Sequence, residues 1–228
     1  MKNINTSFKF LKFGDFQRKG HNDKEMDPRH IKRIEGEKVI YLTFDMCPSS
    51  KLDSDIIDYL KKSRYEASFF VCVDWIEKNQ GGVDFSFLDD PSFTIGGHGY
   101  HHVDPLKQSD DEQLEDLNKA LNYWIDSGKK IHWYRTPFGH PTETTFSFLK
   151  KNGIKCASWS GPVFDKKDGG VNYNPNDAAK FYIENSLRDG DIVLMHANGQ
   201  GINTLKILKE FTYELSKQGY KFKKLPNV

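Results

Sequence analysis

Two kinds of hydrophobic pattern alternate along this chain. Short runs rich in β-branched and aromatic residues predict buried strands, and segments with apolar residues at every third or fourth position predict amphipathic helices. The clearest helical segment covers residues 110–127. Its apolar face is formed by Leu114, Leu117, Leu121 and Trp124.

Strand-like and helical segments follow one another over most of the sequence. The strand-like runs cover residues 39–45, 67–74, 93–97, 132–136, 155–160, 191–196 and 220–225. The helical segments cover residues 53–63, 110–127, 143–152, 176–187 and 203–218. This alternation predicts an α/β fold with a parallel sheet, either a doubly wound sheet or a barrel. No GxGxxG motif follows the first strand, which disfavours a dinucleotide-binding domain.

The polar and weakly patterned residues 1–38 predict an N-terminal extension, followed by one domain over residues 39–228. A length of 228 residues suits a single α/β domain. No apolar run is long enough to span a membrane, and the N-terminus lacks the apolar segment of a signal peptide. We therefore expect a cell-envelope or secreted protein if an export signal has been removed, and a cytoplasmic one otherwise.

Charge and cysteine content exclude several classes of protein. The net charge is +1 and no stretch carries five like charges in a row, so nucleic acid is not an expected partner. The three cysteines form no CxxC pair and cannot all pair with one another, so no disulfide framework is expected. Cys72 and Cys156 are interpreted as small buried hydrophobic residues.

Polar residues with catalytic or ligand chemistry stand at or just beyond the predicted strand ends. They are Asp45, His98, His101, His102, Arg135, Trp159, Asp165 and His196. Each has an ordinary structural explanation when it is taken alone: His196, for example, could be a core histidine. In a parallel barrel, however, the carboxyl ends of the strands meet at one mouth, where active sites form. The shared position therefore favours a functional site.

Five motifs in order resemble those of the polysaccharide deacetylase family (the NodB-homology domain, carbohydrate esterase family 4). They are TFDxxP at 43–48, GHxxxH at 97–102, RxPFG at 135–139, a Trp–Asp segment at 159–165 and LMH at 194–196. The resemblance implies a distorted (β/α) barrel of about seven parallel strands. It also implies a hydrolase of non-peptide carbon–nitrogen bonds, which removes N-acetyl or sometimes O-acetyl groups from a polysaccharide or oligosaccharide with the help of a divalent metal.

The resemblance implies a role for each matched residue. Asp45 is the expected catalytic base and Arg135 the residue that holds it. His98 and His102 are the expected metal ligands, with Zn²⁺ the favoured ion. The remaining roles fall to the Phe138 backbone N–H for the oxyanion, Trp159 for the acetyl pocket, His196 for the catalytic acid and Asp165 for the carboxylate that tunes it.

Met46 departs from the family pattern, because it stands where the family has a second acid that binds the metal. A thioether is a poor ligand for Zn²⁺. We hypothesise that Met46 faces the metal site, so that Met46→Asp would raise metal affinity. Natural replacements for the missing ligand are a water, Asp45 itself or one of Asp104, His101 and His140; weak metal binding and a metal-free reaction are the other options. Pro162 and Lys166 also depart from the family pattern, which predicts a differently shaped acetyl pocket.

Two further functions stay open beside the deacetylase. One is a metal-independent amidohydrolase that acts on a small cyclic amide, related to allantoinases. The other is a catalytically silent glycan-binding barrel, favoured by the missing metal-binding carboxylate. Retention of Asp45, Arg135 and His196 argues against the silent barrel, because a binding protein needs neither a base nor an acid.

Overall fold

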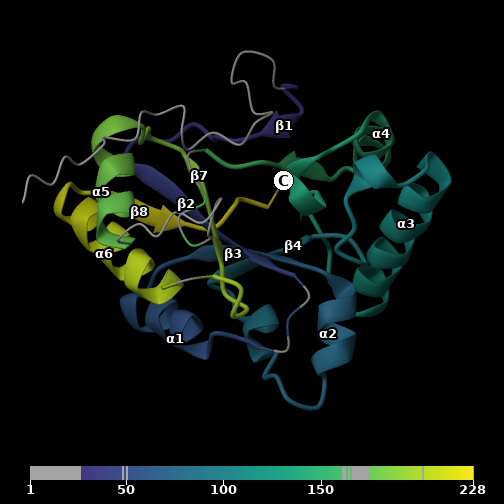
Figure 1. Ribbon diagram of the computed structural model, residues 1–228, viewed down its shortest axis with the longest axis horizontal. Helices are drawn as coiled ribbons and strands as arrows, with labels where there is room; N and C mark the ends of the chain where they lie inside the picture. Colours follow the sequence, from purple (N-terminus) through teal and green to yellow (C-terminus); the bar gives the residue numbers. More distant parts are fainter. Residues whose placement is uncertain are drawn as a thin grey trace, which may run out of the picture.

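The computed structural model describes residues 27–47, 49, 51–160, 163, 165, 175–201 and 203–227. In these residues a parallel sheet has the strand order β1-β6-β5-β4-β3-β2-β7, and β8 pairs with β2 (Figure 1). The strands are β1 (His30–Ile31), β2 (Val39–Met46), β3 (Ala67–Val71), β4 (Phe93–Gly97), β5 (Trp133–Tyr134), β6 (Lys155–Ala157), β7 (Ile192–His196) and β8 (Lys221–Lys223).

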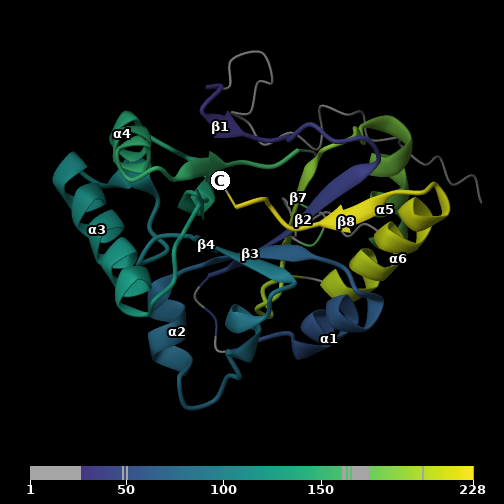
Figure 2. The ribbon, with the colours of Figure 1, turned by 180° about the vertical axis from the view of Figure 1, so that it is seen from behind.

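Helices lie around the outside of the curved sheet (Figures 1 and 2). They are α1 (Ser54–Ser63), α2 (Val73–Asn79), α3 (Asp110–Asp126), α4 (Glu143–Lys151), α5 (Pro175–Asn185) and α6 (Thr204–Lys217). Short 3₁₀ turns cover Ser86–Asp89, Pro105–Lys107 and Pro137–Gly139. Within the described residues, none of these helices combines the length and the apolar character needed to cross a membrane.

Irregular hydrogen bonds close the sheet into a distorted barrel. The Ser160 N–H donates to the Ile192 carbonyl at 2.8 Å, and the Ile192 N–H donates to the Lys32 carbonyl at 3.2 Å. These bonds join the β6 side of the sheet to β7 without a regular ladder. The expected distorted (β/α) barrel is confirmed, and the doubly wound sheet is excluded.

Alternation along β2 separates two apolar regions. Ile40, Leu42, Phe44 and Met46 belong to the large core between the sheet and the helices. Tyr41 faces the other way, into a smaller cluster inside the barrel with Trp133, Ile192 and Leu225. Since Tyr41 lies near the start of its strand, and Trp133 and Ile192 are the first residues of theirs, this cluster fills the amino-terminal end of the barrel. The opposite end, where the strands finish, is left for polar groups.

Every predicted strand run contains an observed strand, but several runs extend beyond it, and the run at 67–74 includes the start of a helix. The strand ends at Val71, and α2 begins at Val73. Backbone N–H groups of Val73 and Asp74 donate to the carbonyls of Gly99 and Tyr100, which fixes the start of this helix. Seven residues are too few to show a clear helical period, so the sequence pattern missed α2.

Part of the predicted extension joins the barrel. His30 and Ile31 pair with Cys156 and Ala157 of β6, and the Ile34 N–H donates to the Gly190 carbonyl at 2.9 Å. Residues 27–38 therefore pack against the domain, whereas residues 1–26 lie outside the described residues. The boundary at residue 39 stays a prediction.

Candidate active site

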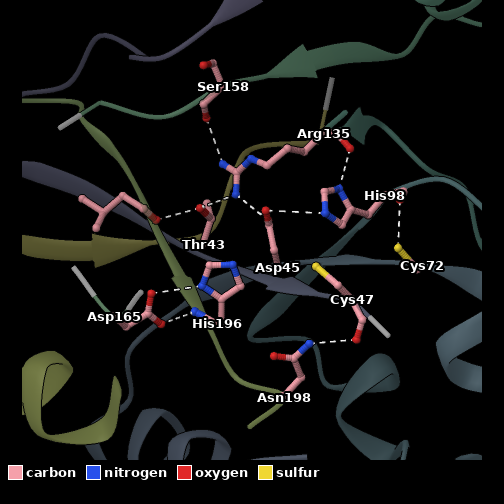
Figure 3. A network of polar contacts seen from close by, with 11 residues as sticks. Thr43, Asp45, Cys47, Cys72, His98, Arg135, Ser158, Asp165, His196 and Asn198 are labelled. Atoms are coloured by element: carbon pink, nitrogen blue, oxygen red, sulfur yellow. Dashed lines mark hydrogen bonds and ion pairs between the residues drawn. The ribbon is translucent and has the colours of Figure 1, made fainter. Parts of the chain in front are cut away.

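Four of the expected site residues meet at the carboxyl ends of neighbouring strands (Figure 3). Asp45 of β2 lies directly beside His196 of β7 in the strand register. His98 follows the last residue of β4, and Arg135 follows the last residue of β5. The parallel sheet therefore brings together side chains that are up to 151 positions apart, as the numbers of Asp45 and His196 show.

Arg135 is the centre of the network below the barrel mouth. Its Nη1 atom donates to Asp45 Oδ1 at 2.8 Å and to Thr43 Oγ1 at 2.9 Å, and its Nη2 atom donates to the Ser158 carbonyl at 2.9 Å. The guanidinium carbon lies 4.2 Å from the centre of the Phe70 ring. Because these contacts come from several different strands or strand ends, the buried guanidinium has a fixed orientation.

The carboxyl group of Asp45 is buried and paired with Arg135. Burial is the largest influence and acts to raise the pKa of Asp45, but the attraction of Arg135, His98 and His196, together with the Arg135 hydrogen bond, outweighs it and holds this pKa below its ordinary value. The carboxyl group is therefore ionised at neutral pH. A buried, ionised carboxylate held by one oxygen can accept a proton with the other.

One ring nitrogen of His98 has the arrangement of a metal ligand. The Nδ1 atom donates to the Arg135 carbonyl at 2.6 Å, which leaves the lone pair on Nε2. This Nε2 atom is buried without a hydrogen-bond partner among the described residues, and it lies 3.6 Å from Asp45 Oδ2. Burial lowers the pKa of His98, so the neutral form that binds metal is favoured. A buried nitrogen of this kind fits a divalent cation.

A second histidine and a cysteine complete this group. The ring centres of His98 and His102 are 5.1 Å apart. Cys47 Sγ and one ring nitrogen of each histidine lie within 4.8 Å of one another, a candidate group for a metal ion within the described chain. Cys47 was not expected from the sequence, although its place in the TFDxxP motif, just before Pro48, was an available signal.

His196 and Asp165 form a buried pair on the other side of Asp45 (Figure 3). Nδ1 of His196 donates to Asp165 Oδ1 at 3.0 Å, and the His196 backbone N–H donates to Asp165 Oδ2 at 2.6 Å. The hydroxyl of Thr204 also donates to Oδ2, at 2.7 Å. Three donors thus orient one carboxylate, which in turn fixes the imidazole with its Nε2 atom available. Thr204 was not expected from the sequence.

The RxPFG loop is strained beside His102, whose ring centre lies 4.7 Å from that of Phe138. Phe138 is 42% exposed and has φ 60° and ψ −1°, a left-handed conformation that is unfavourable for a bulky residue. At the next position a Cβ atom would lie 2.5 Å from the Trp159 ring, so Gly139 allows the loop to pack on this tryptophan. Such strain is typical of functional loops and costs about 1–3 kcal/mol.

The model of the family described as polysaccharide deacetylase matches residues 32–157, more than half of the chain. The chain belongs to the polysaccharide deacetylase family. It is therefore a hydrolase of the amide bonds of acetylated glycans. The matched region contains Asp45, His98, His102, Arg135 and Phe138, and it ends before Trp159, Asp165 and His196.

Two curated relatives of this polysaccharide deacetylase come from Bacillus species. A peptidoglycan-N-acetylglucosamine deacetylase of Bacillus cereus is 29% identical over 208 residues, which cover 87% of this chain and 93% of the relative. The peptidoglycan-N-acetylmuramic acid deacetylase PdaA of Bacillus subtilis is 29% identical over 199 residues, covering 84% of this chain and 72% of the relative.

Solved structures share the barrel. Bacillus subtilis PdaA, described as a family 4 carbohydrate esterase, has a TM-score of 0.66 at 25% identity, with coverage of 85% of this chain and 81% of that chain. BA3943 from Bacillus anthracis, described as a CE4 family pseudoenzyme, has a TM-score of 0.68 at 23% identity, with coverage of 87% and 68%. The second likeness concerns the fold alone.

The hypothesis that Met46 of this deacetylase faces the metal site is wrong. Its side chain is fully buried in the core between sheet and helices, on the face of β2 opposite to Asp45. Three of the named replacement ligands are paired with other residues or with one another: His140 Nδ1 lies 3.0 Å from Asp104 Oδ1, and His101 Nδ1 lies 3.2 Å from Asp74 Oδ2. Asp45 stays close to the site, because its Oδ2 atom lies 3.6 Å from His98 Nε2. Pro162 and Lys166 lie outside the described residues.

Proposed function

We propose that this chain removes N-acetyl groups from the amino sugars of bacterial peptidoglycan. The observation that carries the proposal is the adjacency of two buried pairs, Asp45 with Arg135 and His196 with Asp165, at neighbouring strand ends. Amide hydrolysis needs a base for the attacking water and an acid for the leaving amine. The names of the relatives supply the class of substrate, and with it a site of action at the cell envelope.

In this proposal Asp45 acts as the general base. Its Oδ1 atom is held by Arg135, and its Oδ2 atom takes the proton of the attacking water. Ionisation at neutral pH, which Arg135 maintains together with His98 and His196 against the effect of burial, is the state that this step requires. Arg135 itself keeps its charge throughout, because a guanidinium does not lose its proton in this pH range.

His196 acts as the general acid. It carries a proton on Nε2 and transfers it to the amine nitrogen as the carbon–nitrogen bond breaks. Asp165 accepts the Nδ1 hydrogen, so the ring keeps one orientation while the charge on the imidazole changes. The Phe138 backbone N–H donates to the developing oxyanion, and Trp159 forms a wall for the acetyl methyl group.

His98 and His102 hold the divalent cation that this family uses. The unpaired, buried Nε2 atom of His98 is the observation that supports this assignment. When it is bound, a cation such as Zn²⁺ supplies Lewis-acid chemistry at the acetyl carbonyl and its attacking water.

Acetate release tests the proposal. The purified chain should release acetate from peptidoglycan fragments or N-acetylglucosamine oligomers, and Asp45→Asn should abolish most of the release. Binding of these glycans without acetate release would favour the silent barrel, for which the core position of Met46 is the supporting observation. Hydrolysis of a small cyclic amide such as allantoin, with no acetate from glycans, would favour the amidohydrolase.

A further inference from the structure

Cys47 lies where the two histidines of the candidate metal site converge. We propose that its thiolate is the third protein ligand, so that the site is Cys47–His98–His102 and selects Zn²⁺ or another thiophilic divalent cation. The inference deepens the proposed function and rests on it for the role of the metal. It assigns a ligand to the position at which Met46 leaves the family motif without a carboxylate.

The geometry of the three donors supports this ligand set. Sγ of Cys47 and one nitrogen of each imidazole lie within 4.8 Å of one another. Figure 3 shows the sulfur on the side of Cys47 that faces the His98 ring. Bond lengths of ~2.0–2.3 Å place tetrahedral ligands roughly 3.5 Å apart. An ion would therefore need to draw any two of these donors together by no more than about 1.3 Å, the difference between 4.8 and 3.5 Å.

Two hydrogen bonds fix the backbone that carries the thiol. Nδ2 of the buried Asn198 donates to the Cys47 carbonyl at 2.8 Å, and the Cys72 N–H donates to the Met46 carbonyl at 3.1 Å. The Cys47 side chain is only 1% exposed. The backbone is therefore held by a hydrogen bond on each side of Cys47, as the support of a metal ligand should be.

A thiolate would supply the negative charge that the site lacks because Met46 replaces the family's metal-binding carboxylate. Methionine is neutral, whereas coordinated cysteine loses its proton to solvent and carries the same −1 charge as the family's carboxylate. Two imidazoles and a thiolate favour Zn²⁺ over hard cations such as Mg²⁺ and Mn²⁺. Three protein ligands also leave a fourth position open, as catalytic zinc sites require.

Cobalt absorption tests the ligand directly. The wild-type chain saturated with Co²⁺ should show a thiolate-to-cobalt charge-transfer band, which Cys47→Ser removes. Cys156→Ser is the matched control: Cys156 is also a buried thiol, but it belongs to a separate apolar cluster, and its variant should keep the band. His98→Ala should weaken Co²⁺ binding, which locates the ion.

Zn²⁺ affinity gives a second measurement. Loss of a group that merely orients a ligand typically costs 10–100-fold in metal affinity, so loss of the ligand itself in Cys47→Ser should cost at least about 100-fold. Cys47→Asp should regain part of this loss and shift the preference toward Mn²⁺. Equal Zn²⁺ affinity of wild type and Cys47→Ser would overturn the proposal. So would Co²⁺ bound by the wild type without the band, a result that needs no variant.

Acetate release from the same samples separates this inference from the proposed function. A charge-transfer band without acetate release would leave the ligand assignment standing and contradict the deacetylase proposal. Acetate release by a wild-type protein without the band would support the deacetylase proposal and contradict the assignment of Cys47 as a ligand.

Discussion

At Asp45 the two carboxylate oxygens have different surroundings. Oδ1 is bonded to Arg135, and Oδ2 lies 3.6 Å from the His98 ring nitrogen that we assign to the metal. The Asp45 carboxylate thus lies between the buried Arg135 guanidinium and the candidate metal site. We therefore expect a change at this one side chain to affect both the proposed reaction and the stability of the fold.

Replacement of this carboxylate by an amide should remove the proposed base. Asp45→Asn is expected to lower kcat by ~10²–10⁴, because an amide cannot accept the proton. Acetate release by the folded variant, checked by circular dichroism, measures the effect. Asp58→Asn makes the same chemical change on an exposed face of α1 and should leave kcat within a few-fold of wild type. Equal turnover of both variants would rule out Asp45 as the base.

The same pair predicts how stability depends on pH. The folded-state pKa of Asp45 lies below 3.8, the value of an unperturbed aspartate. The ionised carboxylate therefore stabilises the fold fully above pH 3.8, and this contribution is lost as the pH falls further through the folded pKa. Removing one partner of a buried pair costs about 3–5 kcal/mol.

Urea unfolding of wild type and Asp45→Asn at several pH values measures this contribution. The difference in unfolding free energy should be largest near neutral pH and should shrink in the acid range, since groups common to both proteins cancel. A difference that stays constant down to pH 3 or grows on acidification contradicts the assigned direction of the pKa.

Two elements of the fold position the candidate site: strand β2 and the turn before helix α6. Met46 is the last residue of β2 that pairs with β3, opposite Val71, so its side chain follows the alternation of the strand into the core. Cys47, the first residue beyond the strand, is released from that alternation. The turn after β7 packs a glycine, Gly201, against the Asp165–His196 pair.

A charge at Met46 should destabilise the fold without completing the metal site. Met46→Asp places a carboxylate among apolar side chains, which costs several kcal/mol or forces the group to stay protonated. Met46→Leu, of similar volume, should cost less than about 1.5 kcal/mol. Thermal unfolding with and without Zn²⁺ checks both variants. Tighter Zn²⁺ binding by the aspartate variant would show that position 46 reaches the site after all.

A methyl group at position 201 should disturb Asp165 and, through it, His196, the proposed general acid. A Cβ atom there would lie 2.0 Å from Thr204 Oγ1 and 2.6 Å from Asp165 Oδ2. We expect Gly201→Ala to lower the unfolding free energy by about 1–3 kcal/mol through overpacking, and to lower kcat as well. Gly81→Ala is the control, because a Cβ at position 81 meets no atom within 4 Å. An unchanged kcat in a folded Gly201→Ala protein would show that the Asp165–His196 pair needs no precise positioning for the reaction.

For the whole molecule, the C-terminal segment closes one end of the barrel and leaves the other for chemistry. The Leu225 N–H donates to Ser68 Oγ at 2.8 Å, and Trp133 Nε1 donates to the Pro226 carbonyl at 2.8 Å. Leu225 itself is fully buried in the inner cluster. The apolar end of the barrel, where the strands begin, is therefore separated along the barrel axis from the polar end, where the strands finish.

Shortening the buried Leu225 side chain should affect stability more than catalysis. Leu225→Ala is expected to lower the unfolding free energy by about 2–5 kcal/mol, the usual cost of deleting a buried leucine side chain. At a temperature where the variant is folded, kcat should stay within a few-fold of wild type. Leu106→Ala, at a 67% exposed position, should change neither quantity appreciably. A large fall in kcat for folded Leu225→Ala would show that the two ends are coupled.

The sequence by itself determined the alternation of strands and helices and which polar residues stand at strand ends. Both are local properties, because side-chain period and strand length are written in neighbouring residues. For this reason the sequence alone selects Asp45, His98, Arg135 and His196 as candidate site residues, and the fold brings them together. Their catalytic roles stay predictions.

Only the tertiary structure decided which residue of the TFDxxP motif lies beside His98 and His102. Whether residue 46 still belongs to the strand depends on its pairing with Val71, which is distant in sequence. That pairing turns Met46 into the core and leaves Cys47 beside His98 and His102. The short helix α2 and the joining of residues 30–31 to β6 were likewise decided by long-range hydrogen bonds, which the local pattern of a sequence does not contain.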